Sequence, residues 1–122
     1  MLTPTQQYGK ESETLAVRYL EKQGYRIIER NYRTRYGEID IIAKDGDTLV
    51  FVEVKARSTG KFGDPKWAIT WKKKKKISMV ALYWLKRTRQ VGKKARFDVV
   101  SIRSDAEDSG IELVKNAFEV AY

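Results

Sequence analysis

Three charged residues interrupt the most apolar part of the chain, and they constrain its fold most strongly. Residues 49–56 read Leu-Val-Phe-Val-Glu-Val-Lys-Ala, so apolar side chains occupy both alternating sets of positions. This composition is typical of a central strand covered on both faces. Glu53 and Lys55 interrupt that segment, and Asp40 interrupts a run of isoleucines just before it. Charges in an apolar strand are costly unless they are paired or bind a metal ion, so these three need a common reason.

Turn and capping signals divide the chain into two helices and five strands. Thr3-Pro4 is typical of a helix start and Gly24 of a helix end, and Thr70 can cap a second helix that runs to about residue 89. Strands are expected at 25–32, 37–44, 48–57, 96–102 and 111–117, the last at a sheet edge, with a loop at 58–65. The order αβββαββ predicts one mixed α/β domain over residues 1–122 with a largely central sheet.

A turn signal at residues 45–47 joins the second and third strands. A two-residue turn at residues 45–46 would place Asp40 opposite Phe51 and Glu38 opposite Glu53. Asp40 and Glu53 would then be diagonal neighbours on one face, about 7–8 Å apart and within reach of one bridging ion. A four-residue turn preserves this arrangement. A three-residue turn would put the two carboxylates on opposite faces unless a bulge restored it.

Glu13 is expected to face the same interior. It precedes Ala16 by three positions and Leu20 by seven, so helical geometry turns it toward the buried face. Carboxylates placed together repel unless a cation intervenes, and oxygen ligands favour Mg²⁺ or Mn²⁺. Lys55 could offset the charge of Glu53, or could orient a water and stabilise charge that develops on a phosphate. The alternative is that Glu53 and Lys55 line a solvated sheet face.

Composition excludes several kinds of chemistry. The chain has no Cys and no His, which rules out disulfides, thiolate zinc sites and histidine general bases. The sequence shows no secretory signal and no apolar run of membrane-spanning length, so a soluble, cytoplasmic protein is expected. Any catalysis must come from Asp, Glu, Lys, Tyr and Arg.

The charge balance predicts a polyanionic partner. Lys and Arg number 25 against 16 Asp and Glu, a formal net charge of +9. Five consecutive lysines cover more than one helical turn, so they cannot all face one surface. Lys72, at the start of the helix, is expected to approach the carboxylates most closely. The cations expected to bind nucleic acid are Arg33, Arg35, Arg57, Lys72, Lys73, Lys74, Lys75 and Lys76. The alternative is a solvated basic surface.

Other residues have simpler interpretations. Trp67 and Trp71 could stack on unpaired bases, although a place in the core is favoured for both. Trp84, at helical spacing from Ile77, is expected in the core. Asp98 interrupts an apolar strand and is expected to be a structural salt-bridge partner. The loop containing residues 62–63 could close over a substrate or be buried.

Several segments together resemble the YraN family of small bacterial proteins of poorly defined function. They are Glu13, residues 31–33, Gly37-Glu38-Ile39-Asp40, residues 51–57 and residues 96–100, and the resemblance runs over nearly the whole chain. That family is similar to restriction-endonuclease-like nucleases of the PD-(D/E)xK type, including archaeal Holliday junction resolvases. The resemblance implies a central mixed β-sheet flanked by helices.

The resemblance also implies roles for individual residues. Asp40 and Glu53 would be metal ligands, aided by the carbonyl of Val54. Lys55 would act on the attacking water, and Glu13 would complete the acidic cluster. Ile39 stands where the motif has proline, a change that the superfamily tolerates.

The function implied is a Mg²⁺- or Mn²⁺-dependent endonuclease that hydrolyses phosphodiester bonds in branched or otherwise structured DNA. Junction resolvases act as symmetric dimers, which leaves a homodimer open. Two alternatives remain. One is a non-catalytic nucleic-acid-binding module that retains the acidic cluster. The other is a protein-interaction adaptor that uses the basic helix on an acidic partner.

Overall fold

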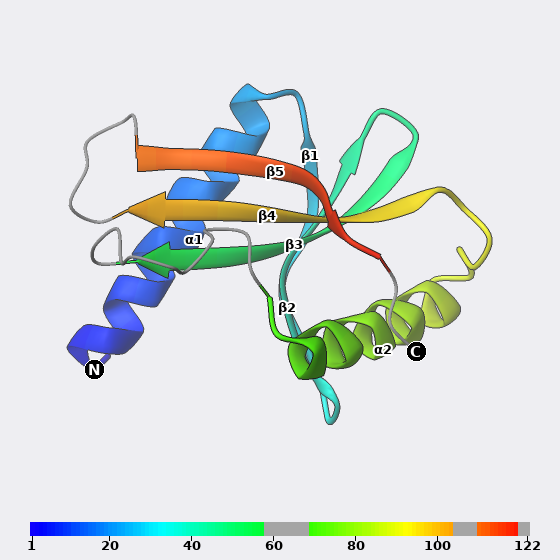
Figure 1. Ribbon diagram of the computed structural model, residues 1–122, viewed down its shortest axis with the longest axis horizontal. Helices are drawn as coiled ribbons and strands as arrows, with labels where there is room; N and C mark the ends of the chain where they lie inside the picture. Colours follow the sequence, from blue (N-terminus) through cyan, green and yellow to red (C-terminus); the bar gives the residue numbers. More distant parts are fainter. Residues whose placement is uncertain (58–68, 104–109, 120–122) are drawn as a thin grey trace.

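Five strands and two helices follow one another in the predicted order. The computed structural model describes residues 1–57, 69–103 and 110–119 (Figure 1). Its elements are α1 (Pro4–Lys22), β1 (Arg26–Thr34), β2 (Gly37–Asp45), β3 (Thr48–Arg57), α2 (Trp71–Arg87), β4 (Ala95–Arg103) and β5 (Ile111–Phe118). The expected αβββαββ order is confirmed, and the architecture is consistent with a restriction-endonuclease-like α/β fold. Neither described helix is long and apolar enough to cross a membrane.

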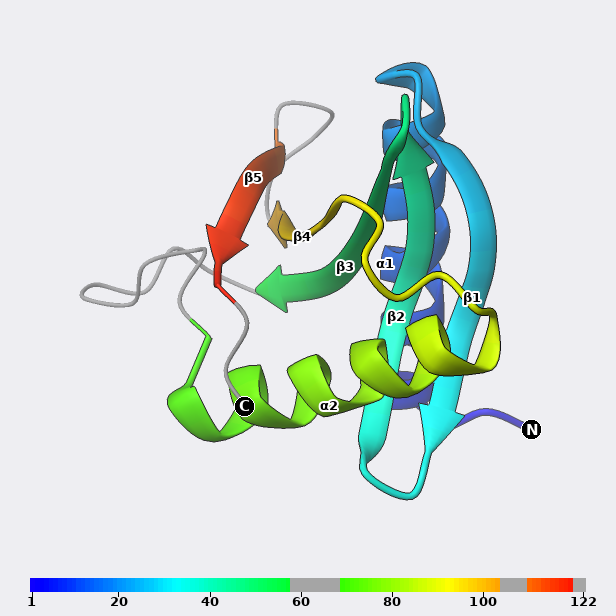
Figure 2. The same ribbon diagram turned by 90° about the vertical axis from the view of Figure 1, so that its right-hand side faces the viewer.

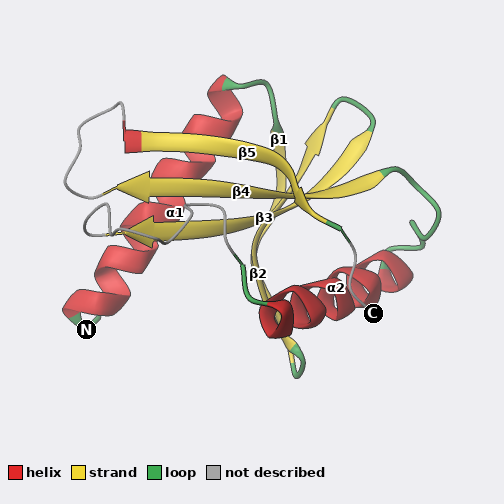
Figure 3. Cartoon of the chain, in the orientation of Figure 1, coloured by secondary structure: helices red, strands yellow, loops and turns green. Residues whose placement is uncertain are grey.

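The strands form one mixed sheet in the order β1-β2-β3-β4-β5 (Figure 3). β1, β2 and β3 are joined by tight turns and pair antiparallel, as hairpins must. β3 and β4 pair parallel, which requires a crossover, and helix α2 lies within that connection. β5 pairs antiparallel with β4 at the sheet edge, as the sequence predicted. β3 is therefore the central strand.

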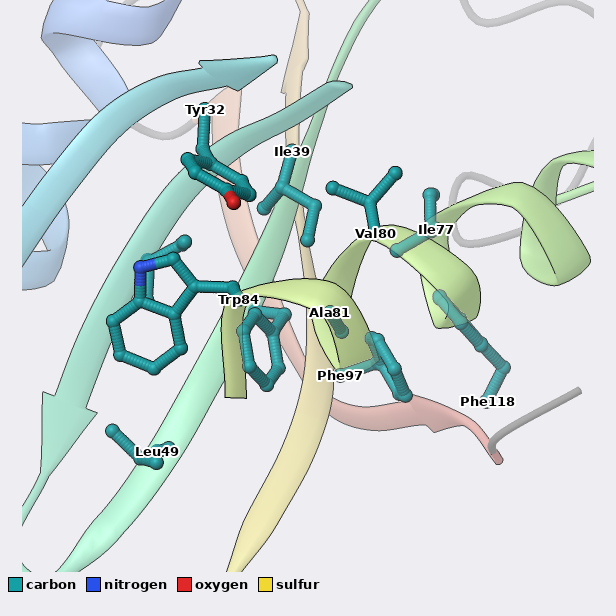
Figure 4. Close-up of a cluster of buried hydrophobic side chains, with 11 residues drawn as sticks. Tyr32, Ile39, Leu49, Ile77, Val80, Ala81, Trp84, Phe97 and Phe118 are labelled. Carbon is teal, nitrogen blue, oxygen red and sulfur yellow. The ribbon is translucent and has the colours of Figure 1, made fainter. Parts of the chain in front are cut away.

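The two helices cover opposite faces of the sheet (Figure 2). α1 packs Ala16 and Leu20 on a cluster that includes Val50 and Val52 of β3. α2 packs Ile77, Val80, Ala81 and Trp84 on the other face (Figure 4). There the Trp84 ring meets Phe51 edge to face, with centroids 5.8 Å apart. Both faces of β3 are thus buried, which explains its double apolar pattern and confirms Trp84 as a core residue.

Both helices begin where their capping residues predict. The Thr3 side chain accepts a hydrogen bond from the Gln6 backbone N–H, and the Gln6 side-chain oxygen accepts one from the Thr3 backbone N–H. Thr70 accepts from the backbone N–H of Lys73 in the same way. The core position favoured for Trp71 is wrong, because 66% of its surface is exposed. Trp67 and the loop at residues 62–63 lie outside the described residues.

The register of the β2–β3 hairpin differs from the predicted one by two residues. Asp45 pairs with Thr48 and Ile42 with Phe51, so the turn consists of Gly46 and Asp47, and Asp40 does not face Phe51. Gly46 has φ +63°, a left-handed conformation that glycine adopts at the first position of a hairpin turn without steric cost. The predicted turn would have required that conformation one residue earlier. A shift of two leaves the face of each side chain unchanged.

β2 and β3 separate at the position of Asp40. Their pairing ends at Ile41 and Val52, and beyond that point β2 pairs only with β1. β3 continues along β4, with Glu53 beside Val99. Figure 2 shows β3 curving away from β2 past this point. We call the opening between Asp40 and Glu53 the fork.

A buried ion pair joins the outer strands to the rest of the sheet. Asp98 of β4 is fully buried and accepts hydrogen bonds from Tyr25 Oη at 2.8 Å, Arg96 Nε at 3.0 Å and the Asn116 backbone N at 2.9 Å. Arg96 also binds Asp45, at the end of β2, at 2.7 Å. Such a carboxylate is tolerated inside the protein only because it is fully partnered. The structural role expected for Asp98 is confirmed.

Replacing Asp98 should therefore be strongly destabilising. We expect Asp98→Ala to lower the free energy of unfolding by about 3–5 kcal/mol, because the Tyr25 and Asn116 donors lose their acceptor and Arg96 keeps only its pair with Asp45 among the described carboxylates. Asp47→Ala is the matched control. Asp47 forms an exposed pair with Lys94 at 3.7 Å, and its loss should cost less than about 1 kcal/mol. Urea unfolding of both variants measures the difference, and equal losses would contradict the role assigned to Asp98.

Candidate functional site

Four carboxylates from three elements meet around the fork. Glu13 comes from α1, Glu38 and Asp40 from β2, and Glu53 from β3. One carboxylate oxygen from each of Glu13, Glu38 and Asp40 lies within 4.8 Å of the other two. On the other side, the charge of Asp40 raises the pKa of Glu53, so these two carboxylates are also electrostatic neighbours. Asp40 therefore stands between the other acidic residues, and the four form one acidic cluster.

Asp40 is held in place by the backbone of β3. Its Oδ2 accepts a hydrogen bond from the Val54 N–H at 2.8 Å, just beyond the last backbone pair of the two strands. Burial raises the pKa of Asp40, and this hydrogen bond opposes the rise because it favours the carboxylate. Val54 therefore contacts Asp40 through its backbone N–H. The carbonyl ligand that the resemblance implies stays a prediction.

Glu13 provides the strongest sign that a partner is missing. Within the described part of the chain, its Oε1 is buried and accepts no hydrogen bond. Burial, followed by the charges of Asp40 and Glu38, raises the pKa of Glu13, while Arg30 and Asn31 oppose the rise. A buried acceptor without a donor costs about 1–3 kcal/mol. An all-oxygen set of carboxylates suits Mg²⁺ or Mn²⁺, so these residues fit the metal that the resemblance implies.

A lysine from α2 balances part of this charge. Lys73 Nζ lies 2.9 Å from Glu53 Oε1, and the Glu53 side chain is buried whereas that of Lys73 is half exposed. Burial and then the charge of Asp40 raise the pKa of Glu53 to about 8, and Lys73 only partly opposes them. Burial lowers the pKa of Lys73, but the pairing with Glu53 outweighs it, so the net shift is upward.

The lysine that reaches the cluster is therefore Lys73, where the sequence favoured Lys72. Both lysines are exposed, but Lys73 precedes the buried Ile77 by four residues and so lies on the side of α2 that faces the sheet. This spacing could have identified Lys73 in advance. Lys55 is partly buried, and strand alternation puts it on the same face of β3 as Glu53.

The acidic cluster opens into a cleft of about 750 Å³ between α1 and the β1–β2 hairpin. Glu13, Glu38 and Asp40 line it, and Arg30 and Arg33 lie at the same surface. Arg33 Nε also pairs with Glu38 Oε2 at 3.2 Å. Carboxylates that can hold a metal ion thus lie beside guanidinium groups that suit a phosphate.

The remaining predicted cations are spread over two surfaces. Arg35 lies in the turn between β1 and β2, and Lys74 Nζ is 5.8 Å from the centre of the Phe118 ring. Lys72, Lys75 and Lys76 are exposed on α2. Arg57 pairs with Arg103 in the sheet, but its side chain lies outside the described part of the chain.

Glu38 is the acidic residue absent from the predicted site. It is two positions before Asp40 on the same strand, and period-two alternation already put the two on one face. The predicted register paired Glu38 with Glu53, so its meeting with Glu13 was not foreseen. Only the packing of α1 against β2 brings those two side chains together.

The raised pKa values predict an unusual pH dependence of stability. Without divalent metal, the folded protein keeps protons on the cluster that the unfolded chain has already released, so its stability should fall as the pH rises from about 5 to about 8. Glu53→Gln should flatten this decline. Glu21→Gln, at an exposed position of α1, should leave it unchanged. Urea unfolding in EDTA at several pH values measures the slopes, and a Glu53→Gln slope equal to that of the wild type would contradict the assignment.

Comparison with known proteins identifies the family. A family model described as uncharacterised protein family UPF0102 matches residues 12–102. A UPF0102 protein of Desulfosudis oleivorans is 54% identical over 119 residues, which cover 98% of this chain and 95% of that protein. A UPF0102 protein of Geobacter metallireducens is 53% identical over 114 residues, 93% of each chain. The chain therefore belongs to the UPF0102 family, which is the YraN family that its motifs resemble.

Proposed function

We propose that this protein is a Mg²⁺- or Mn²⁺-dependent nuclease that hydrolyses phosphodiester bonds in DNA. The observation that carries the proposal is the grouping of Glu13, Glu38 and Asp40, with a buried Glu13 oxygen to which no described residue donates a hydrogen bond. Protons or a cation must offset the repulsion in such a group. A divalent cation would satisfy the orphaned oxygen and lower the raised pKa values at once.

The residues that would hold the metal are Glu13, Glu38 and Asp40, with Glu53 beside them. When bound, the metal supplies Lewis-acid activation of a water and of a phosphoryl oxygen. The Val54 N–H fixes the Asp40 carboxylate, so this ligand needs no rearrangement. The reaction is in-line attack: the water oxygen bonds to phosphorus as the bond to the leaving oxygen breaks.

The ammonium groups of two lysines are placed to interact with the substrate phosphate. Lys73 lies at the cluster through its pair with Glu53, and Lys55 follows Glu53 on the same strand face. Positive groups in a partly buried site stabilise the negative charge that develops on the phosphate during attack. Lys55 can also orient the water, which is the role that the family resemblance implies for it.

A nucleic acid is the polyanion that these features fit, and DNA is the member that the family resemblance implies. The formal net charge of +9 and the guanidinium groups beside the cleft supply sequence-independent attraction to phosphates. Preference for branched or otherwise non-duplex DNA rests on the resemblance to junction resolvases, and it is the finer part of the proposal.

A non-catalytic DNA-binding role is the second candidate, and the ion pair between Lys73 and Glu53 favours it. This pair supplies a cation to the cluster from the chain itself. The same acidic residues could then persist as a structural feature. Metal binding and cleavage distinguish the two candidates, and both can be measured.

Metal binding should stabilise the folded protein. We expect Mn²⁺ to raise the midpoint of thermal unfolding in a concentration-dependent way, since a ligand that binds only the folded state stabilises it by RT ln(1 + [L]/Kd). Glu13→Gln should remove most of this increase. Glu21→Gln, exposed on the same helix, should retain it. An equal increase in both variants would mean that Mn²⁺ binds elsewhere.

Cleavage is tested with labelled duplex, single-stranded and four-way-junction DNA in Mg²⁺ or Mn²⁺. We expect Asp40→Asn to lower the cleavage rate by about 100-fold or more, and Lys55→Ala to lower it comparably. Asp47→Asn is the matched control, because it makes the same change at an exposed turn and should cleave like the wild type. If all variants show the same trace activity as the wild type, the nuclease proposal fails. Wild-type binding without cleavage would support the second candidate.

A further inference from the structure

A second pocket lies at the far end of the β1–β2 hairpin, away from α1. It encloses about 400 Å³ and is lined by Arg33, Thr34, Arg35 and Tyr36 of the hairpin and by Tyr83 of α2. The end of the hairpin projects past α2 in both views (Figures 1 and 2), so the pocket lies where these two elements cross. The crossing is close: a Cβ added to Gly37 would lie 3.8 Å from Lys76 Cβ.

The lining combines flat aromatic rings with guanidinium groups. Arg35 Nη2 donates a hydrogen bond to Tyr36 Oη at 2.9 Å, which orients its guanidinium beside that ring. Tyr36 packs against the core and so is fixed, while Tyr83 is 49% exposed. None of the described lining residues is acidic. A ring that can stack and cations that can bind phosphate are the two elements of single-stranded nucleic-acid recognition.

Arg33 connects this pocket to the acidic cluster. It lines both the second pocket and the cleft that contains Glu13, Glu38 and Asp40, and it pairs directly with Glu38. A polynucleotide that crosses Arg33 would therefore have one nucleotide in the aromatic pocket and a neighbouring phosphate near the carboxylates.

The exposed face of α2 extends the same path. Lys72, Lys76, Met79 and Tyr83 recur at intervals of three or four residues, so they form one stripe along the helix. All four are exposed. The lysines of the stripe can follow a phosphate backbone that leaves the pocket.

The geometry points to a subsite for one unpaired DNA nucleotide, with the base against Tyr83 and its phosphate on Arg35 and Arg33. This inference rests on the proposed function, which identifies the polymer as DNA. It adds that the DNA is unpaired at this position. The pocket is at the small end of the range that holds ligands, so it accommodates a single base and not a base pair. A base in a duplex would have to unstack and unpair to enter. The preferred substrate therefore carries an unpaired segment next to the scissile phosphate.

The test measures binding of a short single-stranded oligodeoxynucleotide, carrying the fluorescent base 2-aminopurine at one position, in EDTA. We expect quenching of the base on binding to the wild type. Tyr83→Ala should abolish the quenching and weaken binding by about 5- to 100-fold. Tyr83→Phe keeps the ring and should behave like the wild type. Leu15→Ala, at an exposed position of α1 that lines neither of the two pockets, controls for the loss of exposed apolar surface and should change the affinity less than about twofold.

Further arms separate this inference from its alternatives. Arg35→Ala should weaken binding and reduce its salt dependence. A fully paired duplex of equal length should bind independently of Tyr83. If Tyr83→Ala binds single strands within about twofold of the wild type, or if the wild type does not bind them, the subsite is refuted. The binding assay contains EDTA and therefore tests the subsite alone. The proposed nuclease function is tested separately by Asp40-dependent cleavage, and it can hold even if the subsite is refuted.

Discussion

Electrostatic repulsion among carboxylates at the fork is the constraint on which the site depends. The packing of α1 and the strands brings Glu13, Glu38, Asp40 and Glu53 together. Like charges at this separation, partly removed from water, cost folding free energy. Lys73, Arg30 and Arg33 offset part of that cost from three directions. No donor among the described residues reaches the buried Glu13 oxygen, so the compensation within that part of the chain is incomplete. Strain of this kind is usual where a site is organised for a ligand.

The sequence predicted the architecture well, because its signals are local. Thr3 and Thr70 cap the helices, Gly46 forms a turn, and apolar residues recur with the period of each element. The face on which Asp40 and Glu53 lie was also predicted, since it depends only on the parity of the register. The register itself was missed by two residues, because the turn signal at residues 45–47 permits two positions for glycine. The backbone conformation of Gly46 selects one of them.

What could not be predicted depends on how the elements rotate and pack against one another. Lys73 reaches Glu53 because of the orientation of α2 on the sheet. Five consecutive lysines have the same chemistry, so residue type alone does not show which of them makes this contact. Glu38 joins the cluster only because α1 crosses β2 at Glu13. Trp71 is exposed because the inward stripe of α2 begins with Lys73 and Ile77, not with its first residue. The aromatic pocket brings together residues that are about 50 positions apart in the sequence, and no local sequence pattern could have predicted that contact.

The separation of β2 from β3 has a consequence for how proteins of this architecture can diversify. Beyond Asp40, β2 has only β1 as a neighbour in the sheet, so this stretch is held by that ladder and by its packing on α2, and not by β3. Residues can be inserted at its tip without breaking any ladder on β3, because none is formed there. The acidic residues at its base would keep their positions while the tip changes length and composition. The same acidic cluster could in this way be combined with hairpin tips of different length and shape.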